Sequence, residues 1–174
     1  AVTALGHGSE VVSQMLEHAG RGLIHTSNLF HTKPAIELAS LLVERSFADK
    51  VFFANSGAEA VEGAIKFARL RGGGERRRIV SFSGSFHGRT LGALAATDHP
   101  EYQDPFRPLP EGFEQAPFGD DHLEMLDERT AAVIVEPIQG EQGVRVADAG
   151  WLESLRGRCD EVGALLVFDE IQCG

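Results

Sequence analysis

Short, mostly apolar runs alternate with segments of helical periodicity along most of this chain. The runs cover residues 51–54, 131–135 and 164–168, which are wholly apolar, and 79–83, which also contains Ser81 and Ser83. A strand that is apolar on both faces is buried on both faces, which is typical of parallel sheets covered by helices. The alternation therefore predicts an α/β fold, with a mostly parallel sheet flanked by helices.

The intervening segments carry apolar residues at helical spacing, and their ends carry helix start and stop signals. The pattern predicts helices over 10–19, 34–47, about 57–70, 90–96 and 151–162. Ser56 and Glu59 have the S-x-x-E spacing of a capping box at the start of the third of these. Residues 98–120 are rich in Pro, Asp and aromatic residues without a clear period, and we expect a long ordered surface loop there.

Composition excludes several classes of protein. Hydrophobic residues make up 43% of the 174 residues and charged residues 24%, as in an ordinary globular chain. The formal net charge of −10 argues against nucleic acid as a partner. No apolar run approaches the ~18 residues of a membrane span. We expect no membrane partner and a reducing, cytoplasmic setting, since there are only two cysteines and no signal-peptide pattern.

Glycine, aromatic or acidic residues follow each apolar run. The segments are Asn55-Ser56-Gly57, Phe86-His87-Gly88-Arg89, Glu136-Pro137 and Asp169-Glu170. Ligands of parallel α/β sheets bind beyond the carboxyl ends of the strands. If these ends lie side by side, they frame one site.

Two of these segments suit the ends of a phosphorylated pyridine. Ser56, Gly57 and Ala58 place backbone N–H groups at a helix start, where phosphate can bind, although a plain helix cap has the same pattern. Asp169 follows a buried strand, where a carboxylate needs a partner. That partner is a protonated pyridine nitrogen in one interpretation, and a helix N-terminus or a metal ion in the ordinary alternatives.

The turn after residue 83 offers three further groups. Phe86 can stack on a flat ring or belong to the core. His87 can move a proton or be a structural histidine. Arg89 can hold a carboxylate through two hydrogen bonds, or form a surface salt bridge. Neither a P-loop, a G-x-G-x-x-G motif nor an H-E-x-x-H pair is present, and we expect no metal site.

Taken together, four segments resemble, in order and spacing, the class-III aminotransferases that depend on pyridoxal 5'-phosphate (PLP). The segments read FANSGAEA (53–60), SFHGRT (85–90), VEPIQGE (135–141) and FDEIQ (168–172). The resemblance is strongest to the acetylornithine and ornithine members of that class. It implies PLP-dependent transferase fold type I, with an N-terminal segment over 1–32 and part of the large PLP-binding domain over 33–174.

The resemblance also implies a role for each residue of the site. Gly57 and Ala58 would bind the PLP phosphate with Ser56 capping the helix, Phe86 would stack on the ring beside His87, and Asp169 would pair with the ring nitrogen. Ile171 would pack on the opposite ring face, and Gln172 would contact the ring hydroxyl. Arg89 would grip the substrate α-carboxylate, Glu141 would pair with a downstream arginine and swing with the substrate, and Glu136 would support the site.

Some positions depart from the family. Gly6-His7-Gly8-Ser9-Glu10 stands where G-H-x-H-P is usual, and Cys173 where Thr is common. Lys33, Lys50 and Lys66 do not match the position of the Schiff-base lysine, so we expect that residue beyond Gly174 in a longer protein. Neither chain end has the pattern of a natural terminus, so an inactive fragment is one alternative.

The expected activity is transfer of an amino group from N-acetylornithine, or an ornithine-like amine, to 2-oxoglutarate by a homodimer, as in arginine biosynthesis. Other class-III reactions remain open, namely those of 4-aminobutyrate or LysW-lysine-type aminotransferases and of glutamate semialdehyde aminomutase.

Overall fold

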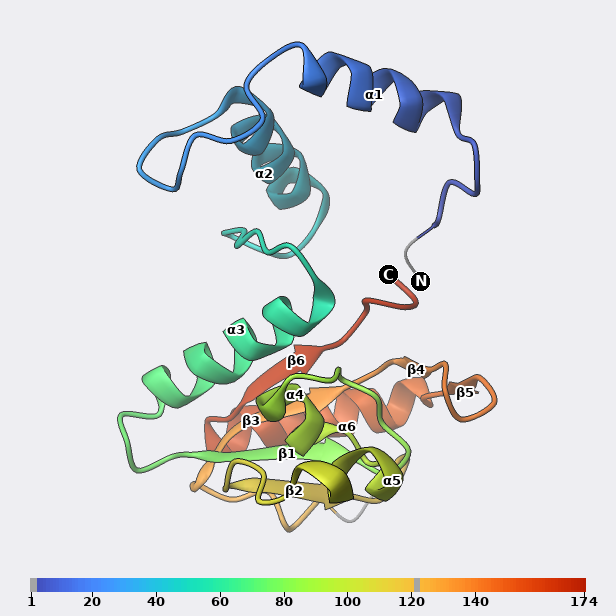
Figure 1. The fold of residues 1–174 in the computed structure, drawn as a ribbon. Coiled ribbons are helices and arrows are strands. Elements are labelled where there is room, and N and C mark those ends of the chain that lie inside the picture. Colours follow the sequence, from blue (N-terminus) through green and yellow to red (C-terminus); the bar gives the residue numbers. More distant parts are fainter. Residues whose placement is uncertain (1–2, 121–122) are drawn as a thin grey trace. The chain divides into compact units, whose positions relative to one another are not determined.

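The computed structural model describes residues 3–120 and 123–174, and it divides into two compact units, Ala1–Phe53 and Ala54–Gly174. The first unit holds α1 (Glu10–Gly20) and α2 (Lys33–Arg45), close to the predicted ranges (Figure 1). Both helices are amphipathic, yet neither has a buried residue.

The second unit is built on a four-stranded parallel sheet in the order β2-β1-β3-β6. The strands are β1 (Arg78–Phe82), β2 (Phe113–Ala116), β3 (Thr130–Val135) and β6 (Leu165–Phe168). All six residues of β3 are buried, as its apolar run predicts. The expected α/β fold with a parallel sheet flanked by helices is confirmed.

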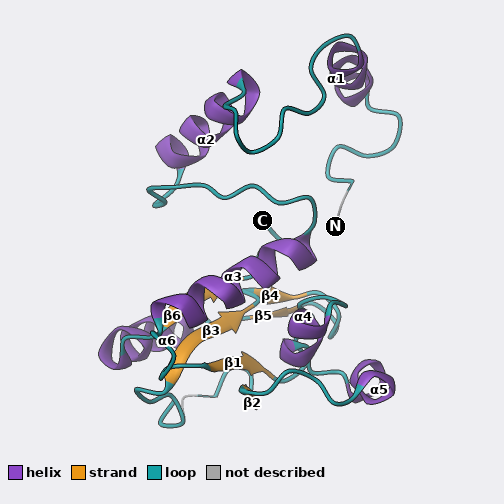
Figure 2. Cartoon of the chain, turned by 60° about the vertical axis from the view of Figure 1, so that its left-hand side comes forward, coloured by secondary structure: helices purple, strands orange, loops and turns teal. Residues whose placement is uncertain are grey.

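Helices cover both faces of this sheet, as Figure 2 shows from the side. Val80, Phe82 and Val133 pack with Trp151 and Leu155 of α6 (Ala149–Val162) on one face. The alternate strand residues pack with α3 (Gly57–Arg71) and α4 (Leu91–Ala96) on the other face, in a cluster of Val61, Ile65, Ala68, Ile79, Ala93, Ala131, Ala132 and Ile134. Because successive strand residues point to opposite faces, both faces are apolar and both are covered.

Two sequence predictions are wrong. Residues 51–54 form no strand, because an apolar run also needs a neighbour to complete its hydrogen-bond ladder and no described strand pairs with it. Residues 98–120 are not one loop. They contain α5 (Pro100–Gln103), a turn of 3-10 helix (Asp104–Phe106) and β2, an edge strand whose central residues are exposed and polar. A small hairpin of β4 (Ile138–Gln139) and β5 (Arg145–Val146) was also not predicted.

Candidate functional site

The carboxyl ends of β1, β3 and β6 come together at one edge of the sheet. Phe86 and His87 follow β1, Glu136 follows β3, and Asp169 follows β6. The backbone N–H of Phe86 donates to Oε2 of Glu136 at 3.0 Å, and Nδ1 of His87 lies 2.7 Å from Oδ2 of Asp169. Three of the four predicted segments therefore form one cluster, although no contact between them was predicted.

The His87–Asp169 pair is the buried centre of this cluster. The exposed fraction of the residue is 3% for His87 and 9% for Asp169. A carboxylate can only accept, so Nδ1 of His87 donates to it. The other carboxylate oxygen accepts from the N–H of Ile171 at 3.2 Å, and the backbone N–H of His87 donates to Oγ1 of Thr97 at 2.8 Å. Both residues are thereby fixed in orientation.

Glu136 fixes the backbone of the neighbouring aromatic residue. It is 6% exposed, and burial raises the pKa of its carboxyl group, an effect that the hydrogen bond from Phe86 partly opposes. The half-buried Phe86 follows directly on this bond. The supporting role expected for Glu136 thus has a defined contact, namely to the main chain of Phe86.

The start of α3 lies against the loop that follows Asp169. Oγ of Ser56 accepts from the N–H of Glu59 at 3.2 Å, and Oε2 of Glu59 accepts from the N–H of Asn55 at 2.6 Å, so the predicted capping box is present with its return bond one residue earlier. A Cβ atom on Gly57 would lie 2.6 Å from Cδ1 of Ile171. A larger residue at position 57 would therefore require the Ile171 side chain to move.

The first two N–H groups of α3 are free to bind an anion. Those of Gly57 and Ala58 donate to no acceptor within residues 3–120 and 123–174. Unpaired N–H groups and the helix dipole both favour negative charge at this position. A hollow of about 120 Å³ lies between α3 and β6, on the face of the sheet that α3 covers, and Asp169 and Ile171 are among the residues that line it.

Arg89 is exposed, and in the described part of the chain it makes no ion pair or hydrogen bond. Its guanidinium carbon lies 3.7 Å from the ring centroid of Tyr102 and 5.6 Å from that of Phe86. Arg89 therefore forms no salt bridge with a described residue, although a surface salt bridge was the alternative interpretation of this position. Tyr102 was missed because it lies in the segment predicted to be a loop.

The remaining predicted residues lie at the rim. Gln172 packs near Gly140, where an added Cβ would lie 3.3 Å from Cγ of Gln172. Glu141 is exposed and is not brought into contact with Arg89 or Asp169 by any described interaction. Sequence reasoning also missed Glu62, whose Oε1 accepts from Oγ1 of Thr90 and from two N–H groups at the start of α4.

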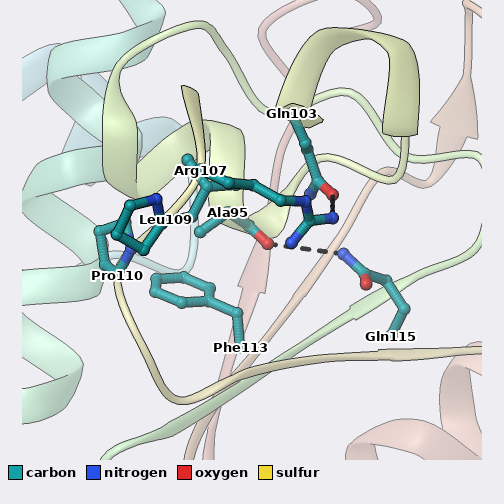
Figure 3. A pocket seen from close by; sticks show the side chains of 8 residues that line it. Ala95, Gln103, Arg107, Leu109, Pro110, Phe113 and Gln115 are labelled. Atoms are coloured by element: carbon teal, nitrogen blue, oxygen red, sulfur yellow. Dashed lines mark hydrogen bonds between the residues drawn. The ribbon is translucent and has the colours of Figure 1, made fainter. Parts of the chain in front are cut away.

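A separate hollow of about 530 Å³ lies beside β2 and contains none of the predicted residues (Figure 3). Its polar groups bond to one another: Nη2 of Arg107 donates to Oε1 of Gln103 at 3.1 Å, and Nε2 of Gln115 donates to the carbonyl of Ala95 at 3.5 Å.

Within the described ranges, no group of three or more His, Cys, Asp or Glu residues is arranged to hold a metal ion. No helix in the same ranges has the length and apolar character to cross a membrane. This edge of the sheet and the adjoining start of α3 bring together a buried carboxylate, two N–H groups without a described acceptor, an aromatic ring and a guanidinium group without a described ionic partner. This set is complementary to a phosphorylated, protonated ring and to a substrate carboxylate.

The family model described as "Aminotransferase class-III" matches residues 1–174. The chain belongs to the class-III aminotransferases. It is 49% identical over 182 residues to the acetylornithine aminotransferase of Methanocaldococcus jannaschii, an alignment that covers 99% of this chain and 45% of that protein. The chain thus spans less than half the length of this class-III relative.

Solved structures of aminotransferases resemble the chain in fold. The ornithine aminotransferase of Toxoplasma gondii superposes with a TM-score of 0.91 at 31% identity, covering 98% of this chain and 42% of that one. A second structure of that enzyme, with a TM-score of 0.87 at 29% identity and the same coverage, is described with PLP at its active site. The N-acetylornithine aminotransferase of Stenotrophomonas maltophilia has a TM-score of 0.75 at 38% identity, covering 98% and 43%.

Proposed function

We propose that the protein containing this chain is a PLP-dependent aminotransferase that transfers an amino group from N-acetylornithine, or an ornithine-like amine, to 2-oxoglutarate. The observation that carries the proposal is Asp169, a buried carboxylate held on both oxygens at the sheet edge where α3 begins. The names of the similar proteins favour this substrate and a place in arginine biosynthesis. We further propose a cytoplasmic homodimer whose large domain includes residues 33–174.

The residues present fit PLP. Each oxygen of Asp169 accepts one described hydrogen bond and has capacity for another, and the N–H groups of Gly57 and Ala58 suit a phosphate. When bound, PLP supplies an amine-reactive aldehyde and an electron-withdrawing ring. Asp169 would hold the ring nitrogen of PLP in its protonated form, and His87 would keep the carboxylate of Asp169 oriented toward it.

The other residues of the proposed site confine the ring and bind its substituents. Phe86 would stack on one face of the ring and Ile171 would pack on the opposite face. Gln172 would contact the ring hydroxyl, and Ser56 would cap the helix that binds the phosphate. We place the lysine that bonds to PLP outside these 174 residues, since Lys33, Lys50 and Lys66 do not match its position.

Arg89 binds the α-carboxylate that N-acetylornithine and 2-oxoglutarate share. A guanidinium group holds a carboxylate with two parallel hydrogen bonds, which fixes the orientation of the substrate. We assign Glu141 the role of pairing with a downstream arginine of the longer protein and of moving when substrate binds.

The test compares turnover of N-acetylornithine and 4-aminobutyrate by the full-length protein with 2-oxoglutarate as acceptor. We expect a higher kcat/KM for N-acetylornithine, because 4-aminobutyrate has no carboxylate next to its amino group. Arg89→Gln should lower that value, whereas Arg156→Gln, at an exposed arginine paired with Asp160 on α6, is the matched control. Preference for 4-aminobutyrate would refute the proposed substrate.

A further inference from the structure

The side chain of Arg89 is held by stacking alone. Its guanidinium carbon is 3.7 Å from the centroid of the Tyr102 ring, well within the ~6 Å range of a cation–π contact, and Phe86 is farther away at 5.6 Å. No described carboxylate or carbonyl binds it. Stacking occupies the flat face of the guanidinium group and leaves the N–H groups at its edge available.

The main chain at Arg89 is fixed independently by α3. Oε1 of Glu62 accepts from Oγ1 of Thr90 at 2.6 Å, and from the N–H groups of Gly92 and Ala93 at 2.9 and 3.1 Å. The residue that follows Arg89 is thereby tied down. The backbone does not determine the rotamer of the long Arg89 side chain. Fixing one rotamer when a ligand binds costs conformational entropy.

Tyr102 is itself held firmly. Its ring stacks on His99 with centroids 4.9 Å apart and an interplanar angle of 28°. The next residue, Gln103, is buried, and its Nε2 donates to the carbonyls of Leu94 and Thr97 at 3.1 and 2.7 Å. Helix α5 is thus anchored on α4, which makes the Tyr102 ring a fixed platform.

We propose that Tyr102 is a positioning residue that holds the Arg89 guanidinium face-on, with its edge ready to bind the carboxylate of substrates. This inference rests on the proposed function, in which Arg89 binds that carboxylate. Tyr102 touches no substrate in this proposal. It acts by restricting Arg89 before the substrate arrives, so its removal weakens carboxylate binding without weakening binding of the cofactor.

The test uses the full-length, PLP-loaded protein with Tyr102→Leu, Tyr102→Phe and, as a control on the same segment, the exposed Phe106→Leu. Glutarate, a dicarboxylate that cannot react, reports binding alone by titration calorimetry. For Tyr102→Leu we expect the glutarate Kd and the KM of both substrates to rise roughly three- to tenfold, as expected for loss of one cation–π contact. Tyr102→Phe and Phe106→Leu should stay within about twofold, and the absorbance of bound PLP should not change.

Three results would overturn the proposal. If the Kd of glutarate is unchanged in Tyr102→Leu, Tyr102 does not position Arg89. If glutarate binds more tightly to Tyr102→Leu, stacking on Tyr102 holds Arg89 away from the carboxylate. An equal loss in Tyr102→Phe assigns the effect to the hydroxyl group. If Tyr102→Leu does not fold, Tyr102→Met takes its place with the same expectation.

An Arg89→Gln variant separates this inference from the function on which it rests. If Arg89→Gln leaves glutarate binding intact, the proposed role of Arg89 fails, and that of Tyr102 fails with it. If Arg89→Gln weakens binding and Tyr102→Leu does not, only the inference about Tyr102 is refuted.

Discussion

Replacing His87 by leucine tests the centre of the proposed site. The variant removes the hydrogen bond from Nδ1 to Oδ2 of Asp169, which is 2.7 Å long and lies where the His87 side chain has no exposed surface. A hydrogen bond to a charged group contributes about 1.5–3 kcal/mol, which corresponds to roughly 10- to 150-fold in an equilibrium constant. Asp169 still accepts the hydrogen bond from the N–H of Ile171 in this variant. We therefore expect the PLP dissociation constant to rise about tenfold, at the lower end of that range.

His87→Asn is the matched variant, because its amide nitrogen occupies nearly the place of Nδ1 and still donates to Asp169. Cofactor absorbance measured against PLP concentration in the full-length protein gives both affinities. We expect His87→Asn to stay close to the parent. Wild-type affinity in His87→Leu would refute the reasoning, and so would an equal loss in the two variants, since packing rather than the hydrogen bond would then be responsible.

Three further predictions concern neighbouring residues. Gly57→Val drives side-chain atoms into Ile171, so PLP affinity, read from absorbance, should fall about tenfold, whereas an unchanged affinity would refute the close approach. Burial raises the pKa of the Glu136 carboxyl group above 4.5. The protonated form is therefore favoured in the folded state, and its contribution to stability is lost as pH rises from 4.5 through the raised pKa. Glu136→Gln should remove this contribution to the pH dependence of Tm, and a Tm profile that is unaltered by the substitution would contradict the prediction. Ser56→Ala should lower the free energy of unfolding by about 1 kcal/mol in urea, and Ser56→Asn should retain it.

Local signals in the sequence predicted much of the fold. The apolar runs of β1, β3 and β6 predicted strands because most of their residues pack between helices, with few polar side chains such as Ser81 of β1 among them. The capping box of α3 predicted a helix start within one residue, since both partners lie within five residues of each other.

Pairing between distant segments was not predictable in the same way. The run 51–54 has the composition of a strand, but composition does not say whether a neighbour is present. Conversely, Glu114 and Gln115 of β2 are polar and exposed, as an edge strand allows, so the sequence offered no apolar signal although β2 pairs with β1 over four residues.

Candidate ligand-binding residues are easier to find in the sequence than the residues that support them. A residue proposed to act on a ligand, such as Asp169 or Arg89, stands out by its type and its place after a strand. A residue that acts through another is recognisable only by its contact, as with Thr97 and the backbone N–H of His87, or Tyr102 and the guanidinium group of Arg89.

These supporting contacts follow from the cost of burying polar groups at the edge of a sheet. An unpaired buried donor or acceptor costs about 1–3 kcal/mol, so a partner from another element stabilises a polar group that the loops bring there. His87 takes Asp169 across 82 residues of sequence, and the N–H of Phe86 takes Glu136 across 50. Satisfying these groups is also what fixes the ring of Phe86 and the carboxylate of Asp169. The same bonds that allow the loops to be buried therefore order the proposed site before any ligand binds.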